Sequence, residues 1–111
     1  MHYMSVKQRY FRLLKDGKKS VELRLFDEKR QKIKMGDFIL FSNADDMKEN
    51  FQAKVVDLTW AKDFDTLLNK VNLAETGFQT KNELLTTLDE FYPETKQEKF
   101  GVLGIKVNTN F

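Results

Sequence analysis

The apolar residues at the start of the chain change from a helical spacing to an alternating spacing at Gly17. From Val6 to Leu14 they recur at intervals of three or four residues, which places them on one side of a helix. Ser5 with Gln8 three residues later matches the capping box that begins a helix, and a glycine commonly ends one. The pattern predicts an amphipathic helix between Ser5 and Gly17, with Gly17 in a left-handed conformation.

An alternating pattern follows directly after this glycine, within the stretch DGKKSVELR. Apolar and polar side chains take turns from residue 20 to residue 25, and successive side chains of a strand point to opposite faces. The pattern therefore predicts a half-buried strand. Its core face carries Val21, Leu23 and Leu25, and its polar face carries Ser20, Glu22 and Arg24.

The middle of the chain contains further strand and turn signals. Residues 35–37 form a turn signal ahead of a strand at 38–41, and the polar stretch 43–50 predicts another turn. Residues 51–60 are rich in valine and aromatic side chains, which favours a strand. Asp63 or Asp65 is placed to begin a short helix.

The last third of the chain predicts one helix and one strand. Thr80 and Glu83 repeat the capping box ahead of an apolar helix that Pro93 ends. The tail from 100 to 107 predicts a strand in which Gly101 and Gly104 indicate a bend or a close backbone approach. This order of elements favours an α+β fold: a curved, mostly antiparallel sheet or small β-barrel with helices at its flanks, formed by one domain that spans residues 1–111.

The amino-acid composition limits the kinds of site that the protein can form and the cellular compartment that we expect for it. A chain of 111 residues with 41% apolar content is long enough to form one core without metal or disulfide support. Cysteine is absent and His2, at an end that we expect to be mobile, is the only histidine, so we predict no metal site, no cofactor and a structural role at most for His2. No long apolar run is present, which favours a soluble cytoplasmic protein with no membrane contact.

Charge is divided along the chain at Gly36. Residues 1–36 contain 11 Lys or Arg and four Asp or Glu, a net charge of +7, and the remaining residues contain eight and thirteen, a net charge of −5. A segregated basic segment favours a polyanionic partner such as nucleic acid, because Lys and Arg neutralise phosphates. The alternative is that folding brings the acidic and basic segments together, so that the positive electrostatic potential of the basic segment is cancelled.

The polar side of the strand after Gly17 carries the main candidate site. Glu22 and Arg24 are neighbours on one face, and the long side chain of Lys19 is predicted to reach the mouth of a cleft there. Arg24 offers a planar fork for a phosphate or base edge, Lys19 offers a charge or, if desolvated, a nucleophile or base, and Glu22 orients either. The alternative is an exposed Glu22–Arg24 ion pair that contributes about 0–1 kcal/mol.

Further binding candidates come from the first helix and from aromatic residues. Arg12 and Lys15 lie on the polar side of that helix, and Lys18 follows it. Unpaired bases stack on aromatic rings, and Trp60 at the end of a predicted strand is a better-placed platform than Tyr92. The predicted ligand-binding set is Arg12, Lys15, Lys18, Lys19, Glu22, Arg24 and Trp60, of which Lys19 and Glu22 are also the catalytic candidates.

Gly17, Lys19, Glu22 and Arg24 form a G-x-K-x-x-E-x-R pattern that resembles the motif of the ASCH domain family, a branch of the PUA-like superfamily. The helix before the motif, the IKMGDFILF block and the FYP and FGVLGIKV segments near the end are similar to that family in the same order. The resemblance implies a small mixed β-barrel of about five to six strands flanked by about three helices, with the motif lining one wall of a cleft.

The resemblance implies two classes of function. PUA-like domains often bind RNA, so the first hypothesis is an RNA- or nucleotide-binding module with a basic cleft around the motif. The second is a small amidohydrolase acting on acetylated cytidine nucleosides, because some compact ASCH proteins use the motif lysine with a threonine and a glutamate. Lys19 matches, but Glu22 stands in place of the threonine and favours a protonated Lys19. The acidic partner corresponds to Glu75 or, on the local alignment, to Gly77.

Overall fold

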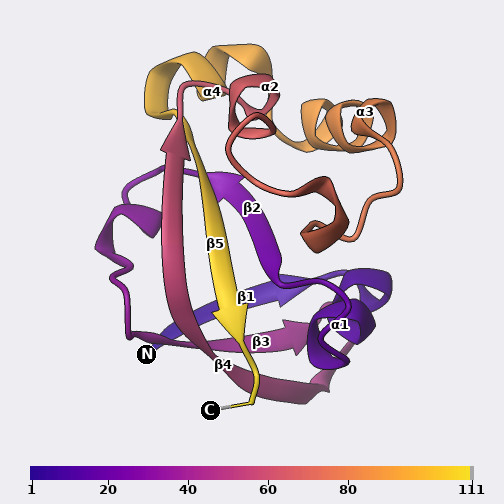
Figure 1. Cartoon of the computed structure of the whole chain (residues 1–111). Coiled ribbons are helices and arrows are strands. Elements are labelled where there is room, and N and C mark those ends of the chain that lie inside the picture. Colours follow the sequence, from indigo (N-terminus) through magenta and orange to yellow (C-terminus); the bar gives the residue numbers. More distant parts are fainter. Residues whose placement is uncertain (111) are drawn as a thin grey trace.

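The computed structural model describes residues 1–110, and Phe111, the last residue of the predicted domain, lies outside the described residues. The chain forms one strongly curled sheet with helices against it (Figure 1). The elements, in order, are β1 (His2–Val6), α1 (Gln8–Lys15), β2 (Val21–Leu25), η1 (Arg30–Lys32), β3 (Phe38–Asn43), β4 (Asp46–Ala61), α2 (Phe64–Leu67), η2 (Leu73–Glu75), α3 (Lys81–Phe91), α4 (Glu94–Phe100) and β5 (Val102–Asn108).

The sheet has the strand order β1-β3-β4-β5-β2, so β1 and β2 are its two edges. β1 pairs with β3 in parallel, and the other three pairs are antiparallel. Figure 1 shows α2, α3 and α4 together above the sheet, with α1 at its lower end. The predicted α+β fold is confirmed as a mixed half-barrel that leaves a seam between β1 and β2. Among the helices described in residues 1–110, none is long and apolar enough to cross a membrane.

Two clusters of buried apolar side chains hold the sheet and the helices together. The first lies inside the curl of the sheet and includes Phe11, Ile39 and Phe41, all fully buried. The second lies between the β2–β5 side of the sheet and the upper helices, and it includes Phe64 and Leu84. β2 lies between the two clusters, so it has apolar neighbours on both faces rather than one wet face.

The predicted helix starts are confirmed in the second half of the chain. Asp63 accepts a hydrogen bond from the Thr66 amide at the start of α2, and Thr80 accepts one from the Glu83 amide at the start of α3. The predicted start at Ser5 is wrong, because that residue lies in β1 and α1 begins after Lys7 without a side-chain cap.

The expected mobility of His2 is also wrong. This residue lies in β1, and its Nε2 atom is 2.8 Å from a carboxylate oxygen of Asp37. The alternation of Met4 and Val6 with polar neighbours was the available strand signal, but five residues are too few to separate it from a helical spacing.

Two further boundaries differ from the prediction. The expected turn at 43–50 is confined to residues 44 and 45, and β4 then continues without interruption for 16 residues. Pro93 ends α3 as predicted, but it also begins a short helix, α4, that the sequence pattern did not reveal. A proline is accepted at the start of a helix because the first amides there have no partner within the helix.

Gly101 is the point of close backbone approach that the tail predicted. Its φ is +74°, and a Cβ atom there would lie 2.5 Å from Nε1 of Trp60. Gly104 is less restricted, because a Cβ atom would meet its nearest neighbour at an ordinary 3.5 Å. The indole of Trp60 therefore lies directly over the start of β5.

Replacing Gly17 with valine is expected to destabilise the protein by about 1 kcal/mol. Gly17 follows the end of α1 with a φ of +78°, a left-handed conformation that a side chain disfavours, although no atom would contact an added Cβ. The measurement is urea unfolding, with Lys18→Val as a control that places the same side chain in the adjacent exposed position. Equal stability of the two variants would contradict a strained turn at Gly17.

Candidate functional site

A pocket of about 180 Å³ lies at the seam where the edge strands β1 and β2 approach each other without pairing. Its walls come from β1, the start of α1, β2, and the C-terminal half of α3 with the turn after it. Lys19, Glu22 and Arg24 of the sequence motif all line it. The fold therefore brings these three predicted residues into one site.

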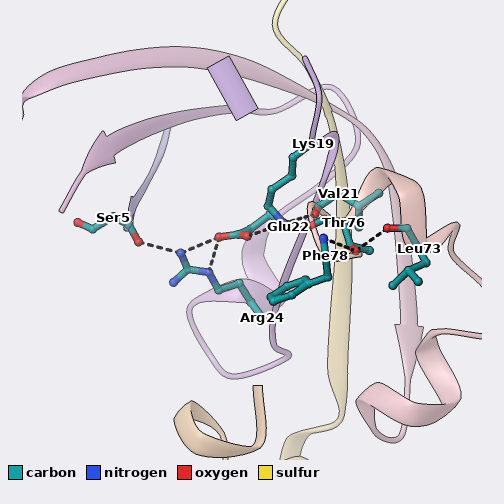
Figure 2. Close-up of polar contacts among 8 residues, drawn as sticks. All are labelled: Ser5, Lys19, Val21, Glu22, Arg24, Leu73, Thr76 and Phe78. Carbon is teal, nitrogen blue, oxygen red and sulfur yellow. Dashed lines mark hydrogen bonds and ion pairs between the residues drawn. The ribbon is translucent and has the colours of Figure 1, made fainter. Parts of the chain in front are cut away.

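Glu22 lies between two cations at the buried end of this pocket (Figure 2). Its Oε1 atom is 3.5 Å from Nζ of Lys19, and its Oε2 atom accepts hydrogen bonds from Arg24, from Nε at 3.0 Å and from Nη2 at 2.8 Å. The exposed fractions of the three side chains are only 2% for Lys19, 9% for Glu22 and 14% for Arg24. We call these three residues the ion triad.

The ammonium group of Lys19 is sealed beneath the pocket. Its Nζ atom donates hydrogen bonds to the backbone oxygens of Val21 at 2.7 Å and Thr76 at 2.6 Å, in addition to its ion pair with Glu22. Gly77 packs on its aliphatic part, where an added Cβ would lie 3.1 Å from Cδ of Lys19. The expectation that Lys19 reaches the mouth of the cleft is wrong, because all three protons of the ammonium group have acceptors below the surface.

The ion triad shifts the pKa values of its members. Burial raises the pKa of Glu22, but the nearby Arg24 and Lys19 charges outweigh burial and hold this pKa below the ordinary carboxyl range. Burial lowers the pKa of Lys19 against the opposing effect of Glu22. Burial also lowers the pKa of Arg24, but the Glu22 carboxylate reverses this effect and leaves it raised. Glu22 and Arg24 are therefore charged at neutral pH, and the two carbonyl acceptors favour a charged Lys19 as well.

The ion triad replaces the missing strand pairing at the seam. Nη2 of Arg24 donates to the backbone oxygen of Ser5 in β1 at 2.9 Å and so bridges the two edges. Glu22 lies opposite Ile105 and Arg24 opposite Leu103, and such cross-strand partners share a face, so both face the cluster inside the curl. The alternative of an exposed Glu22–Arg24 pair is wrong, because both faces of β2 are covered.

Aromatic side chains form another part of the pocket wall. The rings of Tyr10 and Phe78 lie 5.5 Å apart, and the rings of Phe91 and Tyr92 follow at the end of α3. Phe91 is 51% exposed, and Nζ of Lys7 lies 4.8 Å from the centre of its ring. Among these residues, only Tyr92 was a stacking candidate on the sequence pattern. The available signal for Phe91 was its position next to the tyrosine and proline that end the helix.

Comparison with models of known protein families matches residues 4–111 to the ASCH domain. The chain belongs to the ASCH domain family. No curated protein sequence matches it.

Solved structures of similar proteins agree with this assignment. Hypothetical protein PH0355 is 32% identical, with a TM-score of 0.84 over 97% of this chain and 98% of that one. Protein PF0455 from Pyrococcus furiosus is 30% identical, with a TM-score of 0.76 over 98% of this chain and 96% of that one. The ASCH protein from Zymomonas mobilis shares the fold, with 14% identity and a TM-score of 0.66 over 96% of this chain and 65% of that one.

The basic face of α1 in this ASCH domain is largely neutralised by acidic partners. Nη1 and Nη2 of Arg12 bind the two carboxylate oxygens of Glu49 at 2.8 and 3.0 Å, and Arg9 pairs with a glutamate of α3. Lys15 and Lys18 are exposed but lie outside the pocket lining. Folding thus brings acidic and basic segments together on this face, and Arg12, Lys15 and Lys18 are not part of the ion-triad site.

Trp60 lies in a different groove of the ASCH domain. This groove, of about 920 Å³, is lined by residues from the end of β4, from α2, α3 and α4, and by Gly101. The indole is 50% exposed, as predicted for a stacking platform, but it is not brought together with the ion triad.

The residues that a hydrolase would place around Lys19 are not assembled there. Glu75 accepts a hydrogen bond from Oγ of Ser20 at 3.2 Å and pairs with Lys106 at 3.4 Å, outside the pocket lining. Gly77, at the position of the acidic partner in the local alignment, contributes no side chain. Thr76 is buried, and its hydroxyl donates to a backbone oxygen of the preceding turn at 2.6 Å.

Proposed function

We propose that this ASCH domain binds single-stranded RNA and that the pocket beside the ion triad receives one unpaired base. The observation that carries the proposal is an aromatic wall facing buried, fixed charges in one pocket. The charged residues of the lining are Lys7, Lys19 and Arg24 against Glu22, a net charge of +2. Aromatic faces stack with bases of any sequence, and a cationic pocket attracts a ligand that carries phosphate.

The size of the pocket favours a base rather than a whole nucleotide. Its volume of about 180 Å³ is below the roughly 300–1,000 Å³ typical of pockets for drug-sized ligands. In this proposal a planar ring stacks on the half-exposed Phe91, with its polar edge toward the Arg24 guanidinium, which Tyr92 also contacts. The sugar and phosphate then remain at the rim, where the Lys7 ammonium is exposed.

The contacts of Lys19 favour binding over hydrolysis. A nucleophilic or basic lysine needs a free, deprotonated amine that reaches the substrate. Nζ of Lys19 instead donates to two backbone oxygens and faces the Glu22 carboxylate. Within residues 1–110, the hydrogen bonds of Lys19 and Glu22 include none from a serine, threonine or tyrosine hydroxyl, so no activated hydroxyl supports the amidohydrolase hypothesis.

A single-stranded RNA 12-mer of mixed sequence is expected to bind with micromolar-range affinity that weakens as salt rises. Neutralised phosphates release counterions, so the logarithm of the affinity falls with the logarithm of the salt concentration. The slope will be shallow, because the acidic partners of Arg9 and Arg12 leave few free cations near the pocket. Fluorescence anisotropy titrations at 50 and 200 mM salt measure the affinity and its salt dependence.

Two variants test whether this binding takes place at the pocket. Arg24→Ala should weaken binding at both salt concentrations, since it removes the guanidinium charge that lines the pocket, whereas Lys96→Ala on exposed α4 should not. Absence of binding at low salt would contradict the proposal. Release of acetate from acetylated cytidine by the wild-type protein would favour the amidohydrolase hypothesis instead.

A further inference from the structure

The edge of β1 carries a second basic contact next to the pocket. Nη2 of Arg24 donates to the backbone oxygen of Ser5, and Nζ of Lys29 donates to the backbone oxygen of Tyr3 at 2.9 Å. Lys29 comes from the segment that follows β2. The two cations thus occupy successive positions along one strand edge, the first inside the pocket and the second beyond it.

The alternation of β1 explains why these two oxygens are available. The backbone oxygen of Val6 accepts a hydrogen bond from the amide of Ala44 at the end of β3, so Val6 faces the neighbouring strand. In a parallel pair, every second residue bonds to one side, and Ser5 and Tyr3 therefore face the seam. Two residues along a strand correspond to about 7 Å.

The side chain at this second position is suited to stacking. Tyr3 is 60% exposed, which makes it the most exposed aromatic residue described in residues 1–110. A tyrosine that is exposed beside a lysine provides a flat apolar face next to a phosphate-binding charge. The pocket itself does not include Tyr3 or Lys29.

The surrounding charges favour an anion at this position. Lys32 and Lys34 are exposed in the same loop as Lys29. The nearby acids are mostly engaged, because Asp27 pairs with Arg30 and Asp37 with His2. Glu28 is the remaining acid of this loop and is exposed. The loop thus carries three exposed lysines and one exposed carboxylate that has no ion-pair partner among the described residues.

We propose that Tyr3 and Lys29 form a second nucleotide subsite, in which Tyr3 stacks on the base next to the one in the pocket and Lys29 binds the intervening phosphate. This inference rests on the proposed function. The RNA strand then follows the edge of β1 from the pocket toward the loop between β2 and β3, rather than crossing the neutralised face of α1.

The test compares ligands of one and three nucleotides by NMR chemical-shift titration. The four ribonucleoside 5′-monophosphates are titrated first, and the homotrinucleotide of the tightest-binding base follows. We expect the wild-type protein to bind the trinucleotide at least about fivefold more tightly than the mononucleotide, since stacking contributes about 1–3 kcal/mol per base. Tyr3→Ala and Lys29→Ala should each remove most of this gain and leave mononucleotide binding within about twofold. Tyr3→Phe should retain the gain, and so should Lys99→Ala, a matched control in the Trp60 groove.

The outcomes separate this inference from the proposed function. If no mononucleotide binds, the pocket proposal itself fails. If the mononucleotide binds and the gain with length survives both Tyr3→Ala and Lys29→Ala, the second subsite is wrong and the pocket stands. Melting temperatures accompany each titration. A Lys29→Ala variant that loses thermal stability but keeps the gain shows that this lysine only protects the strand edge, which also overturns the inference.

Discussion

Replacing Glu22 with alanine is expected to destabilise the protein by about 3–5 kcal/mol. Glu22 is the only anion of the ion triad, and its removal leaves Lys19 and Arg24 as two buried like charges without a counter-ion. Urea unfolding measures the loss. Glu49→Ala is the matched control, because it removes a carboxylate from the exposed pair with Arg12 and should cost only about 0–1 kcal/mol. Equal losses in the two variants would contradict a structural ion triad.

The pH dependence of stability tests the same carboxylate. The pKa of Glu22 is lowered in the folded protein, so its contribution is fully present above the ordinary carboxyl pKa of about 4.3 and is lost as pH falls toward the lowered value. Below about pH 4.3, the free energy of unfolding of the wild-type protein should therefore fall more steeply with decreasing pH than that of Glu22→Gln, which has no group to protonate at this position. Parallel pH profiles would show that Glu22 is not ionised in the folded state.

Replacing Phe91 with alanine is expected to weaken binding of the RNA 12-mer by about fivefold to a hundredfold, with little loss of stability. The ring lines the pocket and is half exposed, so it adds little to the core but offers a face for stacking. The variant also removes the contact between Nζ of Lys7 and this ring, but it leaves the Lys7 charge at the rim of the pocket. Anisotropy titration measures the affinity, and circular dichroism confirms the fold.

Trp60→Ala provides the comparison for Phe91→Ala. Trp60 is equally exposed but lies in the other groove, so the two variants report on different surfaces. A large loss with Phe91→Ala and none with Trp60→Ala places the base in the ion-triad pocket. The reverse result would move the stacking platform to Trp60, as the sequence alone suggested, and would overturn the pocket proposal.

Local sequence signals predicted most of the fold because they act over a few residues. Gly17 ends a helix in a left-handed conformation, and Asp63 and Thr80 begin helices, as their positions indicated. β1 was not predicted, because an alternation of five residues cannot be distinguished from the helical spacing that follows it. α4 was not predicted either, because its charged sequence, ETKQEKF, has little apolar periodicity.

The sequence by itself determined the ion triad, since Lys19, Glu22 and Arg24 are close neighbours on one turn and strand. Only the tertiary structure decided what they do. β1 and α3 lie outside the motif in sequence, yet they cover the ion triad and add Ser5 and Phe91 to the pocket, and Lys7 follows directly after β1. Burial strengthens charge interactions and seals Lys19 against backbone oxygens, and no local pattern reports which distant segments exclude water from a strand.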